Sequence, residues 1–190
     1  WTFRRTDPRG ARWGLAWLLL YLSLASVQQG RAADVARDLA AARGHSATAW
    51  VIKPTMGNTL LWSARYLTTD SLFAVGVRLP PGAARRYDGD GAARLHWRDE
   101  YASLAGSKLF ADIGRFDRLS DGWLVRHPDH TDVIGDGRYA MLPTALQPLW
   151  GIHIDATRAD EHVPFDSYRD ASSEVRSRYI QMLLGRDLAP

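Results

Sequence analysis

The strongest pattern along the chain is an apolar stretch near its beginning, where Trp13 to Gly30 form 18 consecutive residues without a charged side chain. Apolar residues occur on both faces of a helix drawn through this stretch, and a helix that is apolar all round lies in a protein core or in lipid. A bilayer-spanning helix needs about 17 to 25 residues. The stretch therefore predicts a transmembrane helix, with Trp13 and Trp17 in one interfacial layer and Gln28 and Gln29 in the other.

Two other interpretations fit the same stretch. The basic residues before it and the apolar segment 13–27 also have the arrangement of a secretory signal peptide, and a helix of this composition can be the central helix of a core. The basic residues are Arg4, Arg5, Arg9 and Arg12. For a transmembrane helix, the positive-inside bias predicts a basic cytoplasmic flank at residues 1–12 and places the chain after about Gly30 outside the cytoplasm.

The helix is predicted to continue beyond the apolar stretch. Residues 31–43 are rich in Ala, Leu and Arg, which favour helices, and Gly44 is typical of the residue that follows a helix C-terminus. One helix over 13–44, about 45 Å long at 1.5 Å per residue, would form a transmembrane segment and a stalk. An extramembrane domain over 45–190 would follow. Because the chain begins with Trp1 rather than Met, we expect it to be part of a longer product.

Beyond the stalk, the pattern changes from helical to extended. β-Branched and aromatic residues predict strands at 48–53, 59–68 and 71–78, the last two as a hairpin. The middle strand would carry four side chains on one face: Leu61, Ser63, Arg65 and Leu67. The polar, Gly- and Asp-rich segment 85–99 predicts an excursion of low order.

The second half of the chain is also predicted to contain a helix followed by three strands. The expected elements are a helix over 104–119, strands at 123–126, 132–142 and 149–155, and a terminal helix within 163–188. Asp166 or Ser167 would cap the terminal helix. Helices that alternate with groups of consecutive, hairpin-like strands predict an α+β fold, with a mostly antiparallel sheet covered by helices.

Composition narrows the choice of partners. The formal net charge is +3 and the pI is 9.4, but no run of basic residues is longer than two, so no nucleic-acid surface is predicted. All but two of the 24 basic residues are Arg, which a GC-rich genome explains more simply than a phosphate-binding surface. The absence of Cys excludes thiolate metal ligands, Cys nucleophiles and disulfides.

Two local groups of residues are weak metal candidates. The loop 127–132 concentrates imidazole and carboxylate groups, which suit Zn²⁺ or Mn²⁺, although a solvated polar turn explains it equally well. Its candidate ligands are His127, Asp129, His130 and Asp132. Asp88 and Asp90 resemble the start of a calcium loop but lack the bidentate Glu that completes one.

Asp136 and Arg138 form a second kind of candidate. An ion pair between them would fix the strand to its neighbour, because the guanidinium fork binds carboxylates well. Alternatively, Arg138 would hold the anionic group of a substrate. Four aromatic residues fall on predicted strands, where core packing is the expected role and a floor that stacks on a ligand is the alternative. They are Trp50, Trp62, Trp123 and Trp150.

Two segments carry a family resemblance. The first has the pattern Pro-x-x-x-Asn-x-x-x-Trp and the second the pattern Asp-x-Arg-Tyr; the matching residues are Pro54, Asn58, Trp62, Asp136, Arg138 and Tyr139. With the apolar helix before them, these segments resemble the C-terminal part of the bacterial membrane-bound metal-dependent hydrolases of the YdjM-like inner-membrane family. The resemblance covers about residues 13–155. It implies a bacterial inner-membrane protein whose domain at 45–190 is periplasmic.

The same resemblance limits the function expected of this chain. The metal-binding His and Asp residues of that family lie in an N-terminal membrane part, upstream of the residues matched here. A divalent metal and hydrolase activity are thus implied for the full-length protein, and no cofactor is expected in this part alone. Two hypotheses follow: the chain is a substrate-gating or positioning domain of a hydrolase, or it is a non-catalytic module that binds a partner or envelope component. In both, the lipid bilayer is a partner.

Overall fold

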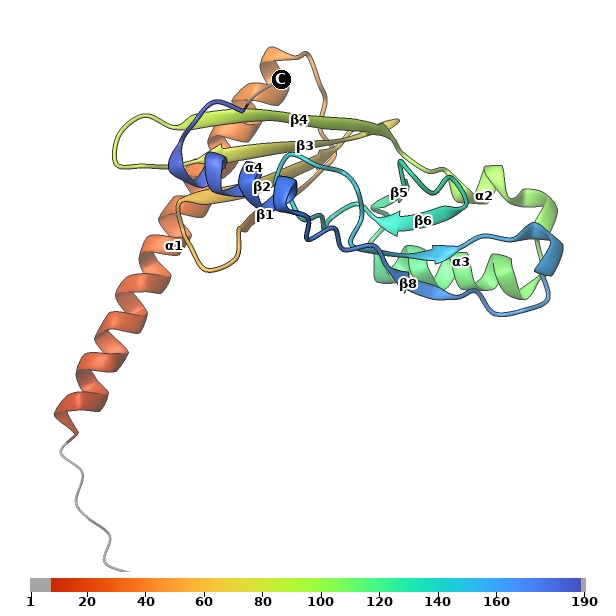
Figure 1. Cartoon of the computed structure of the whole chain (residues 1–190), viewed down its shortest axis with the longest axis horizontal. Helices are drawn as coiled ribbons and strands as arrows, with labels where there is room; N and C mark the ends of the chain where they lie inside the picture. Colours follow the sequence, from red (N-terminus) through yellow and green to blue (C-terminus); the bar gives the residue numbers. More distant parts are fainter. Residues whose placement is uncertain (1–7, 189–190) are drawn as a thin grey trace, which may run out of the picture.

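The computed structural model describes residues 8–188 and begins with the long helix α1 (Arg9–Ala42, 34 residues). The helix ends as predicted, because Arg43 is the C-cap and Gly44 follows with a φ of 69°. Figure 1 shows the first half of α1 projecting away from the rest of the chain. Among the residues of the predicted basic flank, those at 1–7 lie outside the described residues.

The two halves of α1 have different surroundings. Residues 9–27 have no core contact within the described chain and are almost all exposed. From Gln28 to Ala40, one side of the helix is buried against the body of the protein. The small side chains on that side, such as Ala32 and Ala36, let the helix approach the sheet closely.

The first sheet follows directly after α1. It has four antiparallel strands in sequence order: β1 (Ala49–Pro54), β2 (Leu61–Leu67), β3 (Ser71–Arg78) and β4 (Arg85–Ala93). One face packs under the second half of α1, where Trp62, Tyr66 and Val77 are buried. Burying this apolar area is the main term that holds the helix on the sheet.

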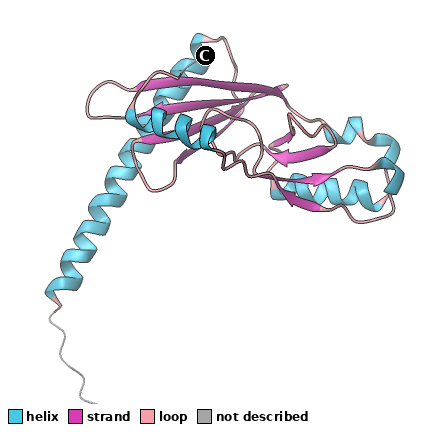
Figure 2. Cartoon of the chain, viewed as in Figure 1, coloured by secondary structure: helices cyan, strands magenta, loops and turns pink. Residues whose placement is uncertain are grey.

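A second four-stranded antiparallel sheet forms the other end of the molecule. Its strands are β5 (Leu124–Arg126), β6 (Val133–Asp136), β7 (Trp150–His153) and β8 (Phe165–Ser167), in that order. Helix α3 (Lys108–Leu119) covers it, with Ile113 and Phe116 buried against the strands. Short helices lie before and after α3: α2 (Trp97–Glu100), η1 (Ala102–Leu104) and η2 (Ala156–Arg158). Figure 2 shows the two sheets side by side, each with its helix.

The two sheets share a small core, and the C-terminal helix returns to the first sheet. Leu72, Trp123 and Val125 are buried together where the sheets meet. Helix α4 (Ser173–Leu184) packs on the first sheet through Met182, and the Nε of Arg78 donates to the carbonyl of Leu183 at 2.8 Å. The fold is therefore α+β with antiparallel sheets and covering helices, as the sequence predicts.

Three details of the sequence-based prediction are wrong. The segment 85–99 is not an excursion of low order but contains β4 and α2. Its Gly89 allows the chain to pass where a Cβ would lie 2.3 Å from the carbonyl oxygen of Thr144. A glycine-rich polar strand lacks the apolar alternation that predicts strands, and only pairing with β3 makes it extended.

The other two errors concern the second half. The strand expected at 132–142 ends at Asp136, after which the chain turns. The terminal helix begins only at Ser173, capped by Ser172, whose side chain accepts from the backbone N–H of Val175 at 3.3 Å. Asp166 and Ser167, expected as caps, belong to β8 and pair with β7. Long-range pairing thus overrides the local capping signal.

Candidate functional site

A cavity of about 820 Å³ lies over the face of the first sheet that points away from α1. Side chains alternate between the faces of a strand, so Trp62 and Ala64 pack under α1 whereas Ser63 and Arg65 line the cavity. Helix α4 and the segment 138–143 form its walls. Most of the lining is apolar, but among residues 8–188 it includes four basic side chains and no acidic one. The basic residues are Lys53, Arg65, Arg138 and Arg176.

Arg65 is the buried charge in the floor of this cavity, with 1% of its surface exposed. Its Nη1 donates to the carbonyl of Gly137 at 3.0 Å and its Nη2 to that of Leu142 at 3.3 Å. Its buried Nε–H has no hydrogen-bond partner among the described residues. Burial lowers the pKa of Arg65 to about 10, although Asp136 and Asp90 attract the charge. A buried N–H donor without an acceptor destabilises the folded protein, unless a bound anion accepts its hydrogen bond.

Arg138 and Asp136 form the predicted ion pair. The Nε and Nη2 of Arg138 donate to Asp136 at 3.0 and 2.8 Å, and the backbone N–H of Arg138 donates to Asp136 Oδ1 at 3.0 Å. Asp136 is buried, and the Arg138 side chain is 19% exposed. The hydrogen bonds from Arg138 to Asp136 raise the pKa of the guanidinium. The pair fixes Arg138 at the edge of the cavity.

Lys53 and Tyr139 form the next part of the lining. The Nζ of Lys53 lies 3.6 Å from the centroid of the Tyr139 ring, a cation–π contact. The same ring lies 4.8 Å from that of Trp150 between centroids, and the Cζ of Arg138 lies 5.6 Å from its centroid. Trp150 thus supports Tyr139 from behind and also packs against the core of the second sheet. The remaining strand tryptophans are Trp50, which packs under α1, and Trp62 and Trp123, which are core residues.

The turn between β1 and β2 closes one end of the cavity. Asn58 organises it, because its Oδ1 accepts from the backbone N–H groups of Leu60 and Leu61 at 3.0 and 2.8 Å. Its Nδ2 donates to the Tyr179 hydroxyl at 3.1 Å, which ties the turn to α4. Met56, at the tip, is 94% exposed and lines the cavity.

The six motif residues are thus partly brought together. Pro54, Arg138 and Tyr139 line one cavity, although they come from segments more than 80 residues apart. Asn58 shapes the turn at its end and Asp136 holds Arg138 in place. Trp62 takes no part, because it is buried on the opposite face of the sheet.

The loop 127–132 does not gather its four candidate ligands. His127 is buried and accepts from the backbone N–H of Asp129 at 3.1 Å. Its ring makes tilted contacts with those of His130 and Tyr168, at 4.7 and 4.9 Å between centroids. Asp132 instead pairs with the Nε2 of His153 at 2.7 Å. Within residues 8–188, no three His, Asp or Glu side chains are grouped as a metal site.

The calcium-loop candidate is also dispersed. Asp88 pairs with Arg43 at 3.0 Å, and Asp90 accepts from the backbone N–H of Leu146 at 3.2 Å. Both carboxylates lie on β4 and therefore have structural partners outside that strand.

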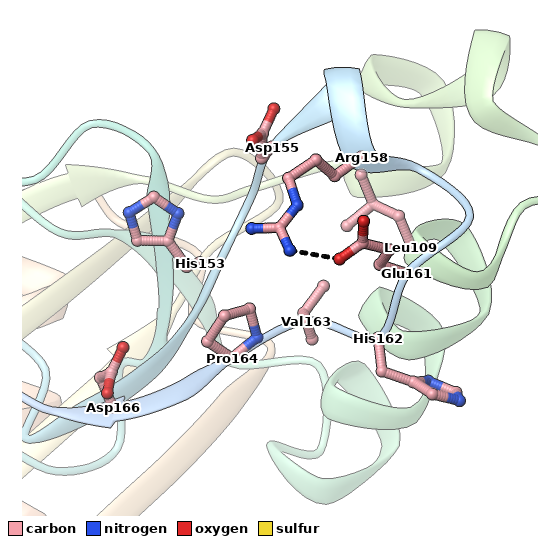
Figure 3. A pocket seen from close by; sticks show the side chains of 9 residues that line it. All are labelled: Leu109, His153, Asp155, Arg158, Glu161, His162, Val163, Pro164 and Asp166. Atoms are coloured by element: carbon pink, nitrogen blue, oxygen red, sulfur yellow. Dashed lines mark hydrogen bonds and ion pairs between the residues drawn. The ribbon is translucent and has the colours of Figure 1, made fainter.

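A smaller hollow of about 260 Å³ lies at the far end, between η2 and the start of β8 (Figure 3). Its two imidazoles, His153 and His162, lie on opposite sides of the hollow, and each is engaged by a carboxylate outside it. An ion pair of Arg158 with Glu161 fills the middle. The two imidazoles, Arg158 and Glu161 are therefore paired with one another or with residues outside the hollow, rather than directed at a common ligand position.

Sequence reasoning missed Lys53, Arg65 and Tyr179 as site residues. The signal for Arg65 was available, because it shares a predicted strand face with Leu61 and Leu67, and a charge among buried apolar positions is unusual. No comparable local signal points to Lys53 or Tyr179. They join the site through β1 and α4, which only the folded chain brings together.

The comparisons with known proteins add no relative. No family model, curated protein or solved structure matches the chain significantly. Helix α1 is long and apolar enough to cross a membrane, and its apolar window is not buried within the described chain. The length, composition and exposure of α1 therefore support a membrane-crossing helix over a core helix.

Proposed function

We propose that this chain is a membrane-anchored binding domain that holds an anionic organic molecule in the cavity between the first sheet and α4. The observation that carries the proposal is the buried Arg65, whose guanidinium donates to two carbonyls rather than to a carboxylate and keeps an unused Nε–H. A cation in such a site is stabilised when a ligand supplies the missing negative charge.

The rest of the lining supports the same class of ligand. Lys53 and Arg176 add positive charge, and no acidic side chain lines the cavity. The apolar walls favour a molecule with a hydrocarbon part, since small-molecule sites combine apolar walls with a few convergent polar groups. An anionic amphiphile has both the negative charge and the hydrocarbon part that this lining favours.

The anchoring part of the proposal rests on α1, and its orientation on the charge bias of the flank. In this proposal, the domain lies on the extracytoplasmic side of a bacterial inner membrane. The family resemblance adds a metal-dependent hydrolase upstream, whose substrate this cavity would position. Binding without catalysis is the function that the residues of this chain support most directly.

The test uses the full chain in nanodiscs of neutral lipid, titrated with dihexanoyl phosphatidic acid and, separately, with dihexanoyl glycerol, which lacks the phosphate. The phosphatidic acid should bind more tightly. Lys53→Gln should weaken its binding by about 10- to 100-fold, since hydrogen bonds to charged groups contribute about 1.5–3 kcal/mol. Arg37→Gln is the matched control, because Arg37 is an exposed residue of α1 that pairs with Asp34 and lies outside the cavity.

Equal affinity for the two ligands would overturn the proposal. So would a Lys53→Gln variant that binds as tightly as Arg37→Gln. Thermal unfolding of both variants checks that the loss is not a loss of fold.

A further inference from the structure

Helix α1 runs alongside the first sheet from one end of its strands to the other. Near one end, the Nε2 of Gln28 donates to the carbonyl of Leu79 at 3.1 Å. Near the other end, the ring Nδ1 of His45 lies 2.9 Å from the hydroxyl of Tyr66. The exposed apolar half of α1 therefore extends beyond the end of the sheet that carries the β1–β2 and β3–β4 connections, as Figure 1 shows.

These two connections differ in charge from those at the opposite end. Residues 54–64 and 79–84 contain no charged side chain, and the exposed Met56 is at the tip of the first. The β2–β3 connection at the opposite end contains Asp70. An uncharged end with an exposed apolar tip beside an apolar helix fits a membrane interface rather than open water.

Basic residues border this uncharged end. The Nη2 of Arg31 donates to the carbonyl of Gly82 at 3.0 Å. Arg85 and Arg86 follow directly in β4, where Arg85 is paired with Asp187 and Arg86 is the further cation. If this end lies at a membrane surface, these basic side chains would contact anionic lipid headgroups. Each basic side chain near such a surface contributes about 1 kcal/mol of electrostatic attraction.

The cavity leads from this end into the domain. Met56, Thr55 and Pro54 line it at the uncharged end, and Arg65 lies further along β2. Arg65 is four residues beyond Leu61, the first residue of β2, which corresponds to about 13 Å at 3.3 Å per residue. The lining at the uncharged end is therefore mostly apolar, and the buried cation lies further along the strand.

We propose that the uncharged end of the first sheet rests in the membrane interface, and that the cavity takes up one anionic lipid directly from the bilayer. The anionic head lies against Lys53, Arg65 and Arg138. The acyl chains pass Met56 toward the hydrocarbon. This inference rests on the proposed function and names its ligand. A lipid is favoured over a soluble anion because the cavity lining reaches the uncharged end of the sheet, beside the exposed apolar half of α1.

The first experiment locates the sheet relative to the bilayer. Because the chain has no Cys, Met56→Cys carries a single environment-sensitive fluorophore in the full chain, reconstituted in nanodiscs that contain nitroxide-labelled lipid. Thr69→Cys, on the exposed β2–β3 turn, is the matched control. Lipid nitroxides should quench the label at 56 several-fold more than the label at 69. Equal quenching at the two positions would overturn the placement.

The second experiment identifies the ligand. The full chain in nanodiscs of mixed phosphatidylglycerol and phosphatidylcholine is released into the gas phase and its mass measured. One phosphatidylglycerol should remain bound, and Lys53→Gln should reduce the occupied fraction at least 10-fold. Met56→Asp should also reduce the occupied fraction, because a carboxylate at the tip of the β1–β2 turn disfavours contact with the membrane interface.

The outcomes separate the two proposals. Binding of the soluble phosphatidic acid without retention of any bilayer lipid would overturn uptake from the membrane and leave the binding function standing. Retention of phosphatidylcholine in equal amount would overturn the selection of an anionic head. Absence of both soluble and bilayer ligands would overturn the two proposals together.

Discussion

The ion pair of Asp136 and Arg138 gives the sharpest stability prediction. Asp136 is 2% exposed and receives three side-chain hydrogen bonds from Arg138, at 3.0, 3.3 and 2.8 Å. Asp136→Ala leaves Arg138 without its partner and removes a negative charge that attracts the buried Arg65. Breaking a buried pair by removing one partner costs about 3–5 kcal/mol. For a chain of this size, that lowers Tm by roughly 6–20 °C, at about 2–4 °C per kcal/mol.

A double-mutant cycle tests this reasoning in thermal unfolding followed by near-ultraviolet circular dichroism. Arg138→Ala also destabilises, because it leaves a buried carboxylate with one backbone donor. The double variant should cost less than the sum of the single changes by about 2–3 kcal/mol, since removing both charges avoids a lone buried one. Additive losses in Tm, or single losses of only about 0–1 kcal/mol as for exposed pairs, would refute the assignment of a buried structural pair.

Three further predictions follow from other parts of the fold. Burial, and then the neighbouring His130, lower the pKa of His127 below 6.5, so the unfolded chain binds a proton that the folded chain does not. Stability should fall as pH drops below about 6.5, and His127→Phe should flatten that slope in urea unfolding at pH 5–7. Gly135→Ala places a Cβ 2.2 Å from the Cγ of Pro148, and should lower Tm by at least 5 °C; an unchanged Tm would mean that the connection moves freely. A truncated chain over 28–190 should unfold cooperatively without detergent, because the core contacts of α1 begin at Gln28; non-cooperative unfolding would show that the apolar half belongs to the core.

The sequence by itself determined the elements whose signals are local. The uncharged stretch and Gly44 define α1 and its end, because helix formation and termination depend on neighbouring residues. Alternation in 59–78 predicts the β2–β3 hairpin, since a short connection leaves the chain few other pairings. The Asp136–Arg138 pair was likewise predictable, because its members are two residues apart.

Local signals failed where distant pairing decided the conformation. The segment that forms β4 has little intrinsic strand preference, and hydrogen bonds from β3 hold it extended. Asp166 and Ser167 have side chains that favour a helix N-cap, but their backbone pairs with β7 as part of β8. In both cases, backbone hydrogen bonds made at long range outweigh a weak local preference.

The cavity is the feature that only the tertiary structure decided. Arg65 could be recognised in sequence as an unusual charge on an apolar strand face, but not as part of a site. Its neighbours come from the β1–β2 turn, the segment after β6 and α4, where Tyr179 holds Asn58 across more than 100 residues of sequence. A site made of residues so far apart depends on the packing of whole elements, because no local interaction brings these side chains together.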